Sequence, residues 1–256
     1  MTGPVEAYAA DRSLKGKLRR RWARLAARRP ARVGLDRPLL SVSFDDAPAS
    51  AVDQGARILE DAGARGTFYI AAGLCGREGP MGRFAEAAEI APLAARGHEI
   101  GCHTFSHLDC GKAEPERIAR DVDSNAAALV AQGLPAPSAF AYPYGDVSVG
   151  AKRVLRGRFR ALRALHPGMV RTGSDLNQLP AVGIEGEDGE TTAAAWLERA
   201  AARRAWLILY THDVAEAPSP WGCTPGALRR LLDRARALGF EIRPVGEALD
   251  RIGAAA

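Results

Sequence analysis

Short apolar runs alternate with amphipathic stretches along the chain from residue 38 onward. The apolar runs predict β-strands at residues 39–44, 66–71, 98–101, 138–142, 159–164, 181–184, 206–211 and 240–244. The stretches between them predict helices at residues 50–62, 83–95, 114–131, 148–157, 191–202 and 225–238. Alternation of this kind is typical of a parallel sheet covered by helices. Seven or eight strand–helix units in about 215 residues favour an α/β barrel over an open sheet.

The positive charge of the chain is concentrated at its N-terminus. Residues 1–40 hold 11 Lys and Arg against 3 Asp and Glu, a net charge of +8, whereas the rest of the chain carries −3. We therefore predict two parts, a basic arm over residues 1–37 and a barrel over residues 38–252. Because nucleic-acid-binding domains carry their basic stripe on the fold itself, the slightly acidic barrel argues against a nucleic-acid partner.

The pattern of the arm predicts one helix. Its apolar positions recur at spacings of four, four and three residues, at Leu14, Leu18, Trp22 and Leu25. Ser13 is placed to cap this helix, and Pro30 ends the pattern. The apolar side then packs on the barrel or on the second subunit of a homodimer, or it lies on an anionic membrane surface.

The lack of a recognisable targeting signal and the small number of cysteines predict a cytoplasmic location. No run of 18 apolar residues predicts a transmembrane helix, and the basic start has no apolar segment of the kind that a secretory signal needs. The four cysteines are expected to be free thiols in a reducing compartment. We expect a cytoplasmic protein that touches the inner membrane peripherally through its arm.

Two adjacent carboxylates follow the first predicted strand. Active sites of α/β barrels lie at the carboxyl ends of their strands, so polar residues placed there are the candidates for chemistry. Asp45 and Asp46 have this position, and side-chain alternation at a strand end points them in different directions. The alternative is an ordinary surface turn.

Three histidines also follow predicted strands. His103 and His107 lie four residues apart after the strand at 98–101, a spacing that lets both bind one ion. His212 follows the strand at 206–211, where its near-neutral pKa suits a proton donor. With one carboxylate, the first two histidines would form an open three-ligand site of the kind that catalytic zinc uses. The alternative for all three is a solvated or capping histidine, and the residues themselves suggest metal-assisted hydrolysis without naming a substrate.

Five motifs in order resemble the polysaccharide deacetylase family (the NodB homology domain, carbohydrate esterase family 4). They are SFDD at 43–46, GTFY at 66–69, GHEIG at 97–101, HTFSH at 103–107 and FAYPYG at 140–145, followed by the strand that ends in His212. The resemblance spans about residues 39–250. It implies a distorted (β/α)7 barrel that binds one divalent metal ion, most commonly zinc.

The resemblance also implies the role of each residue. The positions that match the family's metal ligands are Asp46, His103 and His107. Asp45 matches the catalytic base, His212 matches the catalytic acid, and the backbone N–H of Tyr144 matches a donor to the oxyanion. The implied reaction removes acetyl groups from N-acetylglucosamine units of a glycan.

Two family features are missing from the chain. The family often has Arg-x-Pro-Tyr where residues 141–144 read Ala-Tyr-Pro-Tyr, so the arginine that orients the base is absent. The Asp-x-x-Asp-Trp motif is also absent, and its nearest candidate is RTGSD at 171–175. We expect Asp175 to tune His212, or Arg171 to replace the lost arginine.

The segment after the last long strand resembles a narrower group. Residues 212–214 (HDV) and 218–225 (PSPWGCTP) are similar to bacterial holdfast-type deacetylases, and Ala-Tyr-Pro-Tyr is familiar among exopolysaccharide deacetylases. Trp221 in this segment is expected to stack on a sugar ring, or alternatively to pack the loop onto the barrel.

The leading hypothesis is a metal-dependent N-deacetylase of a bacterial exopolysaccharide of the holdfast type or of its lipid-linked precursor. A small-molecule amidohydrolase on the same scaffold is the second reading. The third is a glycan-binding relic that lost turnover with its arginine.

Overall fold

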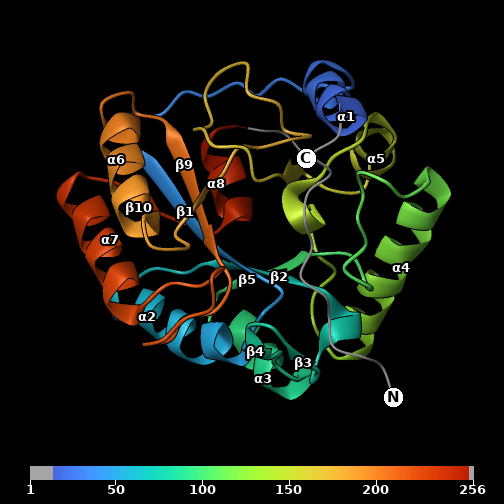
Figure 1. The fold of residues 1–256 in the computed structure, drawn as a ribbon. Helices are drawn as coiled ribbons and strands as arrows, with labels where there is room; N and C mark the ends of the chain where they lie inside the picture. The colour runs from blue at the N-terminus through green and yellow to red at the C-terminus, as the bar shows by residue number, and fades with distance from the viewer. Residues whose placement is uncertain (1–13, 254–256) are drawn as a thin grey trace.

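A curled, parallel β-sheet with helices around its outer face forms the body of the protein (Figure 1). In this computed structural model, which describes residues 14–253, the strand order is β7-β6-β5-β2-β1-β9-β8, with β10 paired to β1. The strands are β1 (Leu39–Asp45), β2 (Thr67–Ile70), β5 (Glu99–Cys102), β6 (Ala139–Ala141), β7 (Ala161–Arg163), β8 (Val182–Gly183), β9 (Trp206–Thr211) and β10 (Glu241–Ile242). The predicted barrel class is confirmed, in the form of a curled half-barrel.

Helices follow the strands nearly where the periodicity predicts them. They are α2 (Ala56–Asp61), α3 (Ala87–Ala95), α4 (Pro115–Ala131), α5 (Val149–Leu155), α6 (Gly189–Ala201), α7 (Pro225–Ala237) and α8 (Val245–Arg251). The stretch before α2 is wound as a π-helix over residues 51–55. The sequence reading missed α8 and the hairpin of β3 (Glu78–Gly79) and β4 (Gly82–Arg83), because such short elements contain too few residues to show a period.

The strand β1 lies at the centre of the sheet, and all seven of its residues are buried. It pairs in parallel with β2 on one side and with β9 on the other. Buried Leu228, Leu231, Leu232 and Ala235 form the inner face of α7, at the spacing expected of an amphipathic helix. Because every strand of this sheet runs in the same direction, all their carboxyl ends open on one side of the molecule.

The arm helix α1 (Leu14–Leu25) is fastened to the rim of the barrel beside α5 (Figure 1). The Nζ of the fully buried Lys152 donates to the carbonyl oxygens of Ala23, at 2.5 Å, and Ala26, at 2.9 Å. The same Nζ lies 2.6 Å from the carboxylate of Asp175. The predicted cap Ser13 lies outside the described residues, as does the side chain of Leu14.

No helix among residues 14–253 has both the length and the apolar content needed to cross a membrane. The four cysteines are free, as expected.

Candidate active site

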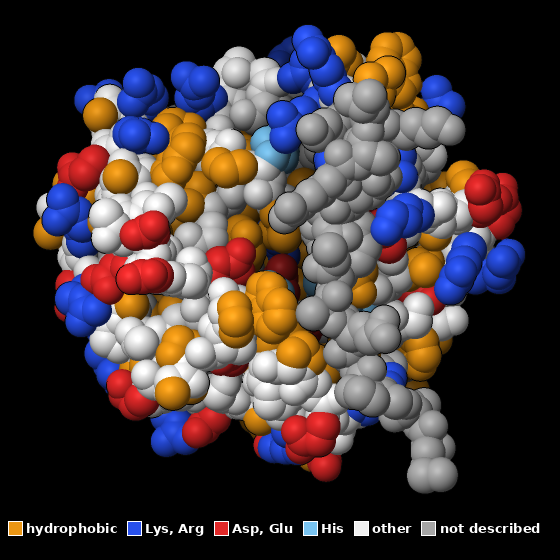
Figure 2. All heavy atoms as spheres, viewed as in Figure 1, with side chains coloured by type: hydrophobic (Ala, Val, Ile, Leu, Met, Phe, Trp, Pro, Cys, Tyr) orange, Lys and Arg blue, Asp and Glu red, His pale blue; other side chains and the backbone are white. Residues whose placement is uncertain are grey.

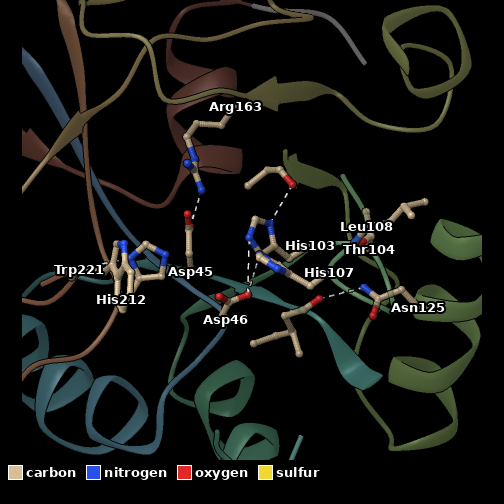
Figure 3. Close-up of polar contacts among 12 residues, drawn as sticks. Asp45, Asp46, His103, Thr104, His107, Leu108, Asn125, Arg163, His212 and Trp221 are labelled. Atoms are coloured by element: carbon tan, nitrogen blue, oxygen red, sulfur yellow. Dashed lines mark hydrogen bonds and ion pairs between the residues drawn. The ribbon is translucent and has the colours of Figure 1, made fainter. Parts of the chain in front are cut away.

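The carboxyl ends of the strands bring the chemistry-bearing side chains together at one side of the sheet, and Figure 3 shows Asp45, His103, Arg163 and His212 among them. Asp45 is the last residue of β1, and Arg163 is the last residue of β7. His103 follows β5 directly, and His212 follows β9. Two further ends, those of β6 and β8, lead to Tyr144 and to Glu185. Figure 2 shows a hollow in this face of the molecule, with acidic and hydrophobic side chains around it.

A compact cluster of three side chains, Asp46, His103 and His107, could hold one metal ion. Their potential ligand atoms all lie within 4.8 Å of one another. The Nε2 atoms of His103 and His107 lie 3.6 Å and 3.3 Å from Oδ1 of Asp46. The Nδ1 of His103 lies 2.8 Å from the carbonyl oxygen of Ala141, to which it donates in the corresponding tautomer. In that tautomer Nε2 carries no proton, and its lone pair is available on the side that faces Asp46.

The chemistry of this cluster fits a divalent cation. Burial lowers the pKa of His103 and of His107 to about 4, so both rings are neutral and can act as ligands. Burial raises the pKa of Asp46, and its Oδ1 is buried without a hydrogen-bond partner within the described part of the chain. A buried carboxylate oxygen in that state is costly, and a bound cation would compensate it. Two nitrogens and one oxygen suit zinc, and they also suit several other first-row metals.

Strained backbone shapes this end of the barrel. Asp46, His107 and Tyr144 have φ angles of 62°, 55° and 60°, in the left-handed region that side chains other than glycine rarely adopt. The Tyr144 ring packs edge-on against His107, with ring centroids 4.3 Å apart. Strain of this kind persists only where surrounding contacts enforce it, and it concentrates at functional sites.

Asp45 forms a fully buried ion pair with Arg163. Burial alone would raise the pKa of Asp45, but the positive charge of Arg163 and the nearby histidines outweigh it and lower the pKa below its usual value. The Arg163 guanidinium also lies over two tyrosine rings, 5.0 Å from the centroid of Tyr69 and 5.4 Å from that of Tyr210. Asp45 is therefore held ionised and oriented at the centre of the site.

The position of Arg163 corrects the expectation for Arg171. Arg163 is the direct lateral partner of Ala141 in the pairing of β6 with β7, so the arginine sits one strand away from its expected place. Arg171 is instead exposed, in a loop where its backbone N–H donates to Ser174. The sequence did contain a signal, because an arginine near the end of a predicted buried strand needs a charged partner.

His212 is positioned by Glu185 and by a backbone carbonyl. Its Nδ1 lies 3.2 Å from the carbonyl oxygen of Trp221 and 3.6 Å from Oε2 of Glu185, whose other oxygen accepts from the hydroxyl of Tyr210. Burial alone would lower the pKa of His212. The carboxylates of Glu185, Asp45 and Asp46 outweigh burial and raise this pKa to about 9. His212 is therefore protonated at neutral pH.

The position of Glu185 corrects the expectation for Asp175. The Asp175 carboxylate accepts from Lys152 and from the backbone N–H of Arg29, so it holds the arm to the barrel. Glu185 follows the predicted strand at 181–184, and it could have been found by the same strand-end rule that singled out Asp45 and His212.

Trp221 lies beside His212 and is half-buried (Figure 3). An open hollow of about 480 Å³ adjoins it, between the segment at 218–224 and the start of α6. Glu187 and Glu190 lie on the far side of this hollow. Trp221 thus lies next to His212, in a segment whose neighbouring residues line the open hollow.

We expect zinc to raise the melting temperature of the protein through the three-residue cluster. A ligand at 100 times its Kd stabilises the folded state by about 2.7 kcal/mol, and His103→Ala should lose this gain. His166→Gln changes a histidine outside the cluster and serves as the matched control. Differential scanning calorimetry with and without zinc makes the measurement. An equal rise in wild type and His103→Ala would place the ion elsewhere.

Comparison with known proteins supports the assignment of the fold and the motifs. Residues 32–157 match the family model described as polysaccharide deacetylase. Among proteins of curated function, none matches this sequence.

Solved structures of carbohydrate esterase family 4 are similar to this chain. The chitin deacetylase of the fungal pathogen Colletotrichum lindemuthianum is 17% identical, with 84% of this chain and 89% of that chain covered and a TM-score of 0.62. The Xyl-CE4 domain of a multidomain xylanase from the hindgut metagenome of Trinervitermes trinervoides is 16% identical (85% and 92% covered, TM-score 0.60). A family 4 acetyl xylan esterase from Clostridium thermocellum, solved with cobalt, is 20% identical (83% and 90% covered, TM-score 0.58). The family model thus assigns residues 32–157 to the polysaccharide deacetylase family, and the solved structures show that the fold is shared over most of the chain.

Proposed function

We propose that this protein removes N-acetyl groups from N-acetylglucosamine units of a bacterial exopolysaccharide of the holdfast type, or of its lipid-linked precursor. The observation that carries the proposal is a pair of buried groups with opposite charge states beside one candidate metal site. Arg163 holds Asp45 ionised, and the carboxylates around His212 hold it protonated. Amide hydrolysis needs such a base and such an acid at the same time. A glycan-binding relic would need neither.

Each residue has a separate task in this reaction. A divalent ion, which we propose to be zinc, supplies positive charge that polarises the carbonyl and acidifies water when it is bound by Asp46, His103 and His107. Asp45 accepts a proton from the attacking water, whose oxygen forms the new bond to the acetyl carbon. The bond from that carbon to nitrogen then breaks, and His212 donates its proton to the departing amine. The products are acetate and a free amino sugar.

Two further groups are proposed to hold the substrate. The backbone N–H of Tyr144 would donate to the oxygen that gains negative charge, an effect of roughly 3–4 kcal/mol for a single donor in other hydrolases. Trp221 would stack on a sugar ring, with the adjoining open hollow of about 480 Å³ receiving a neighbouring unit. An open groove suits a chain-like glycan better than a small molecule, which favours the polysaccharide over the amidohydrolase alternative.

We propose that the reaction takes place in the cytoplasm, with the arm in peripheral contact with the inner membrane. The net charge of +8 over residues 1–40 supports attraction to an anionic surface. In this proposal residues 1–37 act in positioning, and residues 38–252 form the catalytic unit.

Acetate release from a soluble N-acetylglucosamine oligomer tests the proposed reaction. The zinc-loaded wild type should release acetate, and Asp45→Asn should lower kcat by about 10²–10⁴-fold, because the amide cannot accept the proton. Asp53→Asn makes the same chemical change at an exposed position and should match wild type. A zinc-loaded wild type that releases no acetate from this oligomer or from a lipid-linked one would contradict the proposal.

Exchanging two neighbouring residues tests the role of Arg163. Arg163→Ala should lower kcat/KM by about 10²-fold, because Asp45 loses its orienting partner. The double variant Arg163→Ala/Ala141→Arg places an arginine on the adjacent strand and should recover part of that loss. Thermal denaturation of both variants separates a local effect from unfolding. Full activity in Arg163→Ala would remove Arg163 from the mechanism.

The pH profile tests the pairing of His212 with Glu185. His212 acts as an acid only while it is protonated, so activity falls as the pH rises through its pKa of about 9. Glu185→Gln removes a negative charge that raises this pKa and should move the alkaline limb of kcat/KM to lower pH. Glu190→Gln alters a nearby carboxylate that pairs with Arg230, and it should leave the limb in place. An unmoved limb in Glu185→Gln would show that another group sets it.

A further inference from the structure

The outer side of α1 is an exposed apolar surface. Leu18 is 71% exposed, Trp22 is 62% exposed and Leu25 is 65% exposed. Among residues 14–253, Val130 on α4 is the other large hydrophobic side chain that is exposed to a comparable degree, at 54%. Figure 2 shows hydrophobic side chains at the edge of the molecule, next to Lys and Arg side chains, where Figure 1 places α1. We call the three α1 side chains the apolar ridge.

The ridge faces away from the barrel because the opposite side of the helix is the one that packs. Gly16 and Ala23, on that opposite side, are buried. The Lys152 hydrogen bonds to the last turn and the ion pair of Arg19 with Asp146, at 2.6 Å, hold the helix in this orientation. Large apolar residues on the packed side would have been the ordinary arrangement for a helix that only covers a barrel. Here the small residues are inside and the large ones are outside.

The charge around the ridge argues for a particular partner. Residues 13–29 contain eight Lys and Arg and no Asp or Glu. Arg21 and Arg24 are exposed, and the helical spacing places both along one side of the ridge. A second copy of this chain would bring two such basic surfaces together, which like-charge repulsion disfavours. An anionic lipid surface offers the complementary charge and an apolar layer beneath it.

We propose that α1 is a lipid-docking helix. Its apolar ridge enters the headgroup boundary of an anionic membrane, and Arg21 and Arg24 contact lipid phosphates. Trp22 suits this depth because an indole combines a large apolar body with one polar N–H. The purpose of the docking, to bring the barrel to a lipid-linked glycan, rests on the proposed function, but the binding itself does not.

Vesicle co-sedimentation tests the docking without any substrate. Wild type should bind mixed vesicles of phosphatidylcholine and phosphatidylglycerol. Its affinity for vesicles of phosphatidylcholine alone should be lower by roughly tenfold or more. The triple variant Leu18→Ser/Trp22→Ser/Leu25→Ser should lose roughly tenfold or more of the anionic binding. Arg21→Gln/Arg24→Gln should lose most of the preference for anionic lipid. Val130→Ser changes an exposed apolar residue elsewhere and should bind like wild type.

Two further measurements separate the outcomes. Tryptophan emission should shift to shorter wavelength when wild type meets anionic vesicles, and Trp22→Phe should abolish most of that shift. Acetate release from a soluble oligomer should be unchanged in the triple variant, so a failure of docking and a failure of the proposed reaction are read separately.

Equal vesicle binding by wild type and triple variant would overturn the proposal. So would a concentration-dependent dimer that the triple variant breaks, because a second copy would then cover the ridge.

Discussion

The buried ion pair between Asp45 and Arg163 is the interaction on which the active end of the barrel depends. Two adjacent carboxylates, Asp45 and Asp46, are buried where parallel strands end. Removing one partner of a buried ion pair typically costs about 3–5 kcal/mol, because the remaining charge has no compensation. Arg163 compensates Asp45 from within the sheet, and its guanidinium also lies over the rings of Tyr69 and Tyr210. The second carboxylate then remains available to the histidines.

This division of charge explains why neighbouring aspartates behave differently. The pKa of Asp45 is lowered by Arg163, whereas the pKa of Asp46 is raised by burial without an arginine partner of its own. One carboxylate is thus held ionised, as the proposed reaction requires of its base, and the other is free of an arginine and could hold a cation. The two roles come from alternation at the end of β1, which turns the side chains in different directions. The strained φ of Asp46 completes that separation.

The spacing of apolar residues predicted most of the architecture, because it reflects which positions of each strand and helix are buried. The largely apolar segment of β1, with only small serines between its apolar residues, favours a buried strand, and its end marks where polar residues are candidates for chemistry. The same reasoning predicted Asp45, Asp46, His103 and His212 as candidates. It could also have marked Arg163 and Glu185, which lie at strand ends, but not their partners, which lie more than 25 residues away in sequence and become neighbours only through strand order. A motif read along the chain has no access to lateral neighbours.

The arm shows a different limit of sequence reading. Spacing predicted the helix of α1, but it could not show which side would be buried, because a packed helix and a surface-docked helix share one apolar pattern. Here the decision depends on Lys152, which is distant in sequence and binds the last turn of α1. The orientation of this short helix therefore depends on polar contacts with residues far away in the sequence.

The lateral register of Ala141 with Arg163 has a consequence for how such enzymes diverge. Two substitutions are needed to exchange an arginine at position 141 for one at position 163. The intermediate chain carries either both arginines or neither. The chain with neither leaves a buried carboxylate uncompensated, whereas the chain with both places two cations beside two carboxylates and stays close to neutral. On electrostatic grounds the chain with both arginines is therefore the less costly of the two. If family members are sorted as active or inactive by the arginine on β6 alone, a chain that carries its arginine on β7 would be counted as inactive.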